Sequence, residues 1–369
     1  MNDSTPYERR TRDCQRRLRD LGAESVVLFP STNLRYLAGF SEEPKERHFF
    51  LFVPADGEPV FLAPELSADQ VREESWVPDV RGWADEDDPL AAVESVVSDL
   101  DLGGGRVLVD DTMWALFTQD LRAALPDAEF GLASEVLADL RVRKDETELD
   151  ALARAADVAD AIVEDLRELG DDAVGMTENE LAAFVERRAA EYGTQGLSFE
   201  PTVGSGPNGA RPHHSHGDRE VAAGEPVVFD FGVRVDDYPS DQTRTLVFGG
   251  EPSETVREVH EVVQRAQEAA VEAAGPGVPA EAVDAAAREV VEAAGYGEQF
   301  IHRTGHGLGL DVHEEPYIVA GNDRELEPGM VHSVEPGIYL PGEFGVRVED
   351  IVVVTDDGVR RLNHTDRGW

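Results

Sequence analysis

Short apolar runs that stop at turn-forming residues constrain the fold of the first 140 residues more than any other feature. The runs at residues 26–29 and 49–53 each end at a proline. Runs of this length and composition are typical of buried strands. Helical spacing then covers residues 89–100 and 113–125, and a further strand is expected at residues 106–109. Alternating strands and helices predict a small α/β domain with its own sheet.

The pattern changes beyond residue 140. Residues 141–148 are charged and lack an apolar face, whereas helical spacing begins at Leu149, so we expect a domain boundary near residue 143. We therefore assign residues 1–140 to an N-terminal α/β domain and residues 141–369 to an α+β domain. In the second domain the order helix, helix, strands occurs twice, which indicates a duplicated architecture without a visible residue repeat. The expected helices cover 149–166, 178–192 (capped by Thr177 with Glu180), 253–274 and 280–294, and the expected strands 199–203, 227–235, 243–248 and 346–354.

Acidic residues outnumber basic residues by a wide margin. The chain has 76 Asp and Glu against 33 Lys and Arg, which gives a net charge of −43, and Lys45 and Lys144 are its two lysines. Nucleic acid would be repelled. The acids are dispersed through patterned segments, which favours a folded protein with an acidic surface over a disordered tail. Molar salt shortens the Debye length to about 3 Å and screens such a surface, so we expect a halophilic protein, with a merely acidic mesophile protein as the alternative.

Cysteine content and hydropathy narrow the location and the metal chemistry. Cys14 is the single cysteine, so neither an internal disulfide nor a thiolate metal cluster can form. No stretch approaches the roughly 18 to 20 apolar residues of a membrane span, and residues 1–19 do not have the apolar run of a signal peptide. We expect a cytoplasmic protein with no membrane partner, in which oxygen and imidazole hold any metal.

Two aspartates face each other in an expected hairpin. Asp230 lies in an apolar strand, and Asp241 follows a turn at residues 236–239. Paired carboxylates resist ionisation unless a cation compensates, so the pairing indicates a metal site. For either aspartate taken alone, a turn-forming role is the alternative.

A glycine-rich segment adds an imidazole. His306 stands between Gly305 and Gly307, in a segment that also contains His302 and His313. Flanking glycines let the backbone pack close to whatever the imidazole binds. A structural, hydrogen-bonded histidine is the alternative, but three histidines framed by glycines favour a site.

Two glutamates complete the set. Glu335 ends an apolar strand before a Pro-Gly turn, and Glu349 shares a face of the expected strand 346–354 with Arg347. A surface ion pair with Arg347 is the alternative for Glu349, but the apolar run that follows predicts a buried carboxylate that needs a cation. Four carboxylates and one imidazole suit Mn(II), Co(II), Fe(II) or Zn(II), and are enough for two ions.

These motifs resemble the pita-bread metallopeptidases, in the branch of proline dipeptidase and aminopeptidase P. The resemblance covers essentially the whole chain, because residues 33–40 look like the entry to a creatinase-type N-terminal domain and the linker at residues 140–156 is also similar. It implies a pita-bread fold for residues 141–369 and two divalent ions, Mn(II) or Co(II) by preference. The implied ligands are Asp230, Asp241, His306, Glu335 and Glu349, with Asp241 and Glu349 bridging.

The resemblance also implies a mechanism and a substrate class. A hydroxide that bridges the ions attacks the carbonyl ahead of proline in a dipeptide or short peptide, and Glu335 takes up its proton. His213 would contact the substrate, with His214 and His216 as competitors for that role. His313 would stabilise the oxyanion.

Further expectations from the resemblance concern the supporting residues and the rivals. Arg347 and Tyr339 would support the site, with a structural salt bridge and a core aromatic as the alternatives. We expect a homodimer and no organic cofactor. A methionine-type aminopeptidase shares the five ligands but lacks the N-terminal domain. A metal-free pita-bread binding module is the second rival, and five intact ligands argue against it.

Overall fold

The computed structural model describes residues 5–369, which divide into two compact units. The first unit ends at Arg141 and the second begins at Val142. Residues 1–4, where the predicted N-terminal domain starts, lie outside the described part of the chain.

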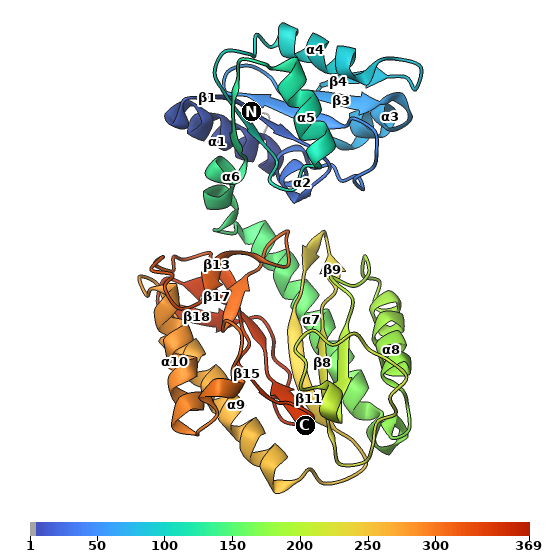
Figure 1. The fold of residues 1–369 in the computed structure, drawn as a ribbon, viewed down its shortest axis with the longest axis vertical. Coiled ribbons are helices and arrows are strands. Elements are labelled where there is room, and N and C mark those ends of the chain that lie inside the picture. The colour runs from blue at the N-terminus through green and yellow to red at the C-terminus, as the bar shows by residue number, and fades with distance from the viewer. Residues whose placement is uncertain (1–4) are drawn as a thin grey trace. The chain divides into compact units, whose positions relative to one another are not determined.

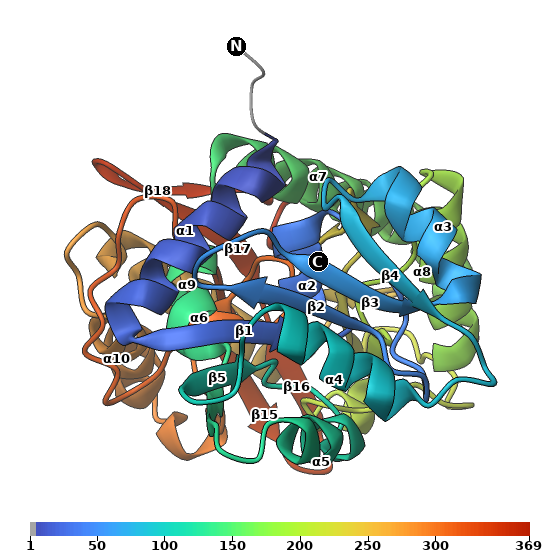
Figure 2. The same ribbon diagram turned by 90° about the horizontal axis from the view of Figure 1, so that it is seen from above.

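A six-stranded mixed sheet forms the centre of the first unit (Figures 1 and 2), in the order β4-β3-β2-β1-β5-β6. β1 (Ala23–Leu28) runs antiparallel to β2 (Phe50–Pro54) and parallel to β5 (Arg106–Val109). The predicted strands and the α/β class are therefore confirmed. The remaining elements are β3 (Val60–Pro64), β4 (Asp79–Trp83), β6 (Glu129–Leu132), α1 (Pro6–Leu21), α2 (Thr32–Ala38), α3 (Glu65–Glu74), α4 (Pro89–Asp99), α5 (Ala115–Ala124) and α6 (Ser134–Arg141).

The second unit repeats the predicted order of helix, helix and strands. Its first half contains α7 (Glu146–Glu168) and α8 (Glu178–Glu191), which pack through one apolar cluster onto the sheet β11-β8-β7 (Figure 1). Capping boxes at Asp145 and Thr177 begin the two helices, because each cap side chain accepts a backbone N–H while a glutamate three residues later returns the bond. The strands are β7 (Thr202–Ser205), β8 (Pro226–Phe231) and β11 (Gln242–Val247).

The second half has the same layout. α9 (Glu254–Ala273) and α10 (Ala280–Ala293) cover the five-stranded sheet β13-β12-β14-β17-β18 through a separate apolar cluster (Figure 1). Its strands are β12 (Gly305–Gly307), β13 (Glu314–Ile318), β14 (Val331–Val334), β17 (Asp350–Thr355) and β18 (Gly358–Arg361). Within residues 5–369, no helix combines the length and apolar character that a bilayer span requires.

Two expected strands are interrupted. The strand predicted at residues 346–354 is in fact β16 (Phe344–Arg347), which pairs with β15 (Gly337–Leu340), and β17 in the five-stranded sheet. The break falls at Glu349, whose N–H donates to the Thr243 carbonyl of β11 at 3.1 Å instead of continuing one ladder. The apolar pattern on both sides hides this change of partner.

The strand predicted at residues 227–235 also ends early. β8 stops at Phe231, and β9 (Arg234–Val235) pairs with β10 (Tyr238–Pro239) across a turn at Asp236 and Asp237, whose φ angles are 50° and 69°. Between them, a Cβ on Gly232 would lie 1.8 Å from the Ser240 carbonyl oxygen, so the close approach of the two chains requires glycine.

The segment that opens the second unit is held by a buried cation. The Lys144 side chain is 1 % exposed, and its Nζ donates to Glu314 Oε1 at 2.7 Å and to the Val142 carbonyl at 3.3 Å. The Lys144 N–H also donates to the Gly329 carbonyl. This ion pair ties the start of the unit to β13.

A buried ionic network joins β11 to β17. Arg244 is 1 % exposed, and its guanidinium donates to Asp350 Oδ1 at 2.7 Å and to the Glu349 carbonyl at 2.6 Å. The second oxygen of Asp350 accepts from Arg361 at 3.1 Å and from Gln267 at 3.0 Å. The network therefore connects both halves of the unit next to the segment that carries Glu349.

Arg244→Met should lower the free energy of unfolding by about 3 kcal/mol, because it leaves Asp350 Oδ1 and the Glu349 carbonyl buried without a donor. The exposed pair of Arg143 and Glu327, at 2.9 Å, supplies the control. Arg143→Met should cost less than about 1 kcal/mol. Urea unfolding in molar KCl compares the two variants, and equal losses would show that the Arg244 network does not stabilise the junction.

Candidate metal centre

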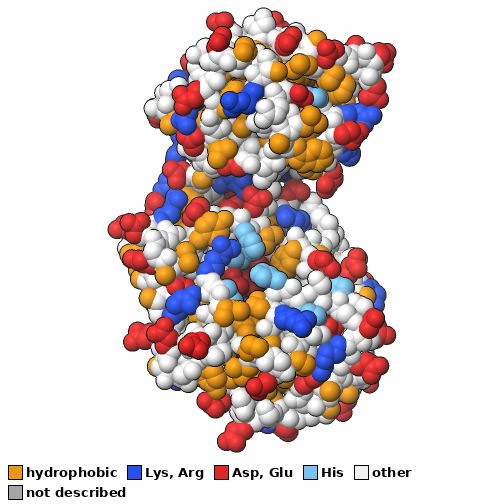
Figure 3. Space-filling model, viewed as in Figure 1, with side chains coloured by type: hydrophobic (Ala, Val, Ile, Leu, Met, Phe, Trp, Pro, Cys, Tyr) orange, Lys and Arg blue, Asp and Glu red, His pale blue; other side chains and the backbone are white. Residues whose placement is uncertain are grey.

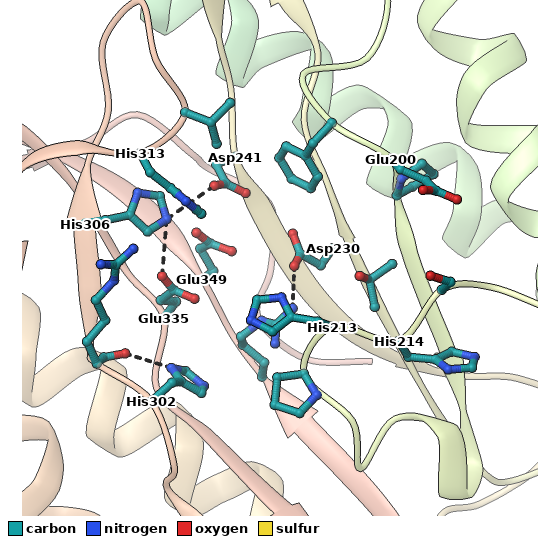
Figure 4. Close-up of a pocket in the computed structure, with 18 residues that line it drawn as sticks. Glu200, His213, His214, Asp230, Asp241, His302, His306, His313, Glu335 and Glu349 are labelled. Atoms are coloured by element: carbon teal, nitrogen blue, oxygen red, sulfur yellow. Dashed lines mark hydrogen bonds and ion pairs between the residues drawn. The ribbon is translucent and has the colours of Figure 1, made fainter. Parts of the chain in front are cut away.

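Side chains from both halves of the second unit converge on one pocket (Figure 4). Asp230 lies on β8 and Asp241 immediately precedes β11, whereas His306 lies on β12 and Glu335 follows β14. Glu349 occupies the break between β16 and β17. Their ligand atoms form three overlapping groups, each with all atoms within 4.8 Å of one another: Asp230, Asp241 and Glu349; His306, Glu335 and Glu349; and Asp241, His306 and His313. All five predicted ligands therefore lie together.

The register of β8 and β11 places the two aspartates. Asp230 pairs with Thr243, so these two side chains share a face of the sheet. Asp241 precedes Thr243 by two residues and points to the same face. The antiparallel pairing and the close approach of the two carboxylates are therefore confirmed, with Asp241 two residues before Thr243, the direct partner of Asp230.

Two buried carboxylate oxygens have no hydrogen-bond donor within residues 5–369: Glu349 Oε1 and Asp230 Oδ1. Glu349 is 1 % exposed, as its apolar surroundings predicted, and its other oxygen accepts from Thr243 Oγ1 at 2.7 Å. A buried carboxylate oxygen without a donor is costly unless a cation lies beside it. Both residues belong to the group that Asp241 completes.

The carboxylates oppose one another's ionisation. Burial raises the pKa of Asp241, and repulsion from Glu349 and Asp230 raises it further. Burial likewise raises the pKa of Glu335 to about 7, and burial with repulsion from Glu335 raises the pKa of Glu349 well above its usual range. Bound cations would offset this repulsion and favour the ionised forms.

His306 presents a neutral imidazole to the carboxylates. Burial lowers its pKa to about 3. Nδ1 lies 3.2 Å from the Gly307 carbonyl, and donation there leaves the lone pair of Nε2 directed at the site, as a metal-ligating histidine requires. Nε2 is 3.3 Å from Glu335 Oε1 and 3.5 Å from Asp241 Oδ2. A Cβ on Gly307 would lie 2.2 Å from the Glu315 carbonyl oxygen, so this glycine is needed for close strand packing.

The donor set passes a chemical test for divalent ions. Four carboxylates and one neutral imidazole are ligands that Mn(II), Co(II), Fe(II) and Zn(II) accept. The unpaired oxygens of Asp230 and Glu349 lie among them. The residues present therefore fit two ions that share carboxylates.

One buried cation already lies behind the site. Arg347 is 3 % exposed and forms an ion pair with Asp230, while its Nη1 donates to Tyr339 Oη at 2.8 Å and its Nε to Thr243 Oγ1 at 3.0 Å. Tyr339 Oη is also 2.8 Å from His302 Nε2. Arg347 therefore links Asp230 to Tyr339 in a buried network, and its ion pair is not a surface salt bridge.

The three neighbouring histidines point in different directions. His213 lines the pocket near the carboxylates (Figure 4). The His214 Nε2 lies 2.8 Å from Glu178 Oε2, and the His216 Nδ1 lies 2.6 Å from Asn179 Oδ1. These bonds direct His214 and His216 toward α8, which supports His213 as the residue that faces a substrate.

The pocket has a volume of about 750 Å³. Histidine and basic side chains gather around the hollow in the second unit (Figure 3). His302 and Arg303 belong to its lining, as do the apolar side chains of Phe199 and Val312. Sequence analysis assigned no role to these four residues, because no motif or spacing connects residues near 199 with residues near 303.

Two sequence comparisons decide the family. Residues 150–356 match the sequence model of Metallopeptidase family M24, and residues 10–143 match that of the Creatinase/Prolidase N-terminal domain. The chain belongs to metallopeptidase family M24. This M24 peptidase therefore combines a creatinase-type N-terminal domain with a pita-bread domain, and the family's chemistry implies divalent metal ions at the site described above.

Relatives of this M24 peptidase match over nearly their full length. An Xaa-Pro dipeptidase from Lactobacillus delbrueckii subsp. lactis is 37 % identical over 95 % of both chains. The crystal structure of a prolidase from Thermococcus sibiricus has a TM-score of 0.94 and 40 % identity, covering 99 % of this chain and 100 % of the other. The crystal structure of dipeptidase PepE from Mycobacterium ulcerans has a TM-score of 0.90 and 41 % identity, covering 100 % and 98 %.

Loss of a shared carboxylate should reduce metal binding. We expect the parent M24 peptidase, stripped by chelation and refilled with Mn(II), to hold two ions per chain, and Glu349→Gln to hold fewer because a neutral amide replaces a buried anionic donor. Elemental analysis of dialysed protein measures the ratio. Glu343→Gln, an exposed glutamate near Glu349 in sequence, is the control and should leave the ratio unchanged. Equal metal content in parent and Glu349→Gln would remove Glu349 from the ligand set.

Proposed function

We propose that this M24 peptidase is an Xaa-Pro dipeptidase, with Asp230, Asp241, His306, Glu335 and Glu349 holding two divalent ions. The convergence of these five side chains on one pocket, with two carboxylate oxygens lacking donors, carries the proposal. The names of the relatives, Xaa-Pro dipeptidase and prolidase, support the substrate class. Residues 141–369 would form the catalytic domain and residues 1–140 the creatinase-like domain.

The ions would contribute one part of the chemistry. When bound, a pair of divalent ions would lower the pKa of a water at the site and polarise the scissile carbonyl. The side chains of the chain supply the remaining steps.

Glu335 is placed to move a proton. Its carboxylate accepts from Ser333 Oγ at 3.1 Å and lies 3.3 Å from His306 Nε2, inside the pocket where the attacking water would be held. In the proposed reaction Glu335 takes the proton of the attacking water. The same proton can then go to the proline nitrogen as the C–N bond breaks, which leaves a free carboxylate and a free imino acid.

His313 is placed to stabilise the oxyanion. Burial lowers the pKa of His313, and the positive charge of Arg303 lowers it further, so the imidazole is neutral and has one N–H to donate. Its ring lies 4.1 Å from that of His306, between centroids. His313 also falls within 4.8 Å of Asp241 and His306 ligand atoms, so a ligand role is the alternative.

Arg303 favours a dipeptide over a longer peptide. Its guanidinium stacks 4.5 Å from the Tyr317 ring centroid and lines the pocket, and no carboxylate within residues 5–369 forms an ion pair with it. A cation that lines the pocket without an ion-pair partner would bind the C-terminal carboxylate of Xaa-Pro. A tripeptide would carry this carboxylate one residue further away.

The substrate proposal is tested by hydrolysis of Gly-Pro, Ala-Pro and Ala-Pro-Ala in molar KCl, after chelation and add-back of Mn(II) or Co(II). We expect metal to restore cleavage of the dipeptides, because the site needs cations to ionise its carboxylates. Ala-Ala serves as the non-proline control. Equal cleavage of Ala-Pro-Ala would instead identify an Xaa-Pro aminopeptidase, and no cleavage of any proline peptide by the metal-loaded protein would contradict the proposal.

Arg303→Met should raise KM for Ala-Pro about tenfold or more, because a charge-assisted hydrogen bond to the substrate carboxylate is lost. Initial rates with Ala-Pro-NH2, which has no terminal carboxylate, supply the matched control. With that amide the parent and Arg303→Met should have similar KM. A similar rise in KM for both substrates would show that Arg303 acts on pocket structure rather than on the carboxylate.

A further inference from the structure

Glu178 is a buried carboxylate of the second unit that does not line the pocket. It is the first residue of α8, and its side chain is fully buried. Oε1 accepts from Ser205 N at 2.8 Å and from Ser205 Oγ at 2.7 Å. Oε2 lies 2.8 Å from His214 Nε2 and accepts from Gly217 N at 3.1 Å. Asn208 Nδ2 donates to both oxygens, at 3.0 and 3.2 Å.

These donors come from the start, middle and end of one loop, residues 205–217. Outside β7 and a short turn at residues 206–208, this loop has no regular secondary structure. The Glu178 carboxylate therefore links residues from three parts of this loop through hydrogen bonds. Arg219 closes its base by donating to Ser205 Oγ at 2.7 Å and pairing with Glu225.

The charge of Glu178 is stabilised in place. Burial alone would raise its pKa, but hydrogen bonds from Ser205, His214 and Asn208 outweigh burial and lower the pKa. Its position at the N-terminus of α8 also favours a negative charge, because the helix dipole is positive at that end. The carboxylate is therefore ionised and accepts every bond described above.

His213 depends on this loop for its orientation. Its imidazole is exposed to the pocket, and within residues 5–369 it has no hydrogen-bond partner of its own. The next residue, His214, is bonded to Glu178 and points away from the carboxylates (Figure 4). Because adjacent side chains share a backbone, holding His214 restricts where the His213 ring can lie.

We propose that Glu178 and His214 are positioning residues that hold His213 against the substrate. The inference rests on the proposed function, in which His213 contacts the peptide. A displacement of about 1 Å in such a residue can cost up to roughly a hundredfold in rate. Glu178 does not line the pocket, and His214, which does, directs its Nε2 at Glu178.

A double-mutant cycle tests the proposal. His214→Phe keeps a ring of similar size but cannot donate to Glu178, and we expect it to lower kcat/KM for Ala-Pro roughly tenfold or more with metal content unchanged. In the background of His213→Ala, His214→Phe should cost less than about twofold, because its effect acts through His213. His216→Gln, in the same loop but bonded to Asn179, should leave kcat and KM unchanged. The proposal is overturned if His214→Phe lowers kcat/KM by the same factor in the His213→Ala background as in the parent. It is also overturned if His214→Phe alone leaves kcat/KM unchanged.

Hydrogen exchange provides a readout that does not depend on activity. In Glu178→Gln, the amide of Gly217 loses a charged acceptor and should exchange at least about tenfold faster than in the parent. The amide of Val203 in β7 is the internal control and should be unchanged. Unchanged exchange at the Gly217 amide would overturn the proposal that Glu178 holds the loop, even if the enzyme is active. The two proposals can fail separately. If exchange at Gly217 is faster in Glu178→Gln but the parent cleaves no proline peptide, Glu178 still holds the loop, and only the proposed substrate class is contradicted.

Discussion

Four carboxylates lie together away from water in the second unit, and their negative charge has to be balanced by other groups. Burial makes Asp241, Glu335 and Glu349 costly to ionise, and repulsion from neighbouring carboxylates, Asp230 among them, adds to that cost. Arg347 supplies one positive charge, to Asp230, and divalent ions would supply the remainder. Because two of the ligands come from each sheet of the duplicated unit, neither half could hold such ions alone.

The neighbouring residues differ in what they do for this arrangement. Thr243 holds both Glu349 and Arg347 through one hydroxyl, so β11 sets the distance between an acid and its counter-charge. Gly307 permits the strand contact behind His306. Glu178 acts further out, on the loop of residues 205–217, where it bonds Ser205, Asn208, His214 and Gly217. The proposed metal ligands thus lie on strands or next to strand ends, whereas His213, which we propose contacts substrate, lies on that loop, where small movements during substrate binding are easier to accommodate.

Much of the fold and of the candidate site was predictable, because local sequence patterns indicate both. The helices of the second unit were found from spacing and from the capping box at Thr177. The five side chains that converge on the pocket were found as carboxylates and an imidazole in apolar or glycine-rich surroundings. The break at Glu349 was not predictable, because valines precede it and an apolar run resumes at Ile351, and only the bond to Thr243 shows that the strand changes sheets. Glu178 was missed for a similar reason. Beside its cap it resembles any acidic residue at a helix start, and its partners lie 27 to 39 residues away.

The scarcity of lysine has a consequence for handling the protein. Of its two lysines, Lys144 is enclosed in its ion pair with Glu314, whereas Lys45 is 57 % exposed on the first unit. Reagents that acylate lysine amines would therefore modify the folded chain at Lys45 and leave the lysine of the second unit unmodified. A dye or a solid support could be attached through that one side chain without derivatising any residue of the unit that carries the metal centre.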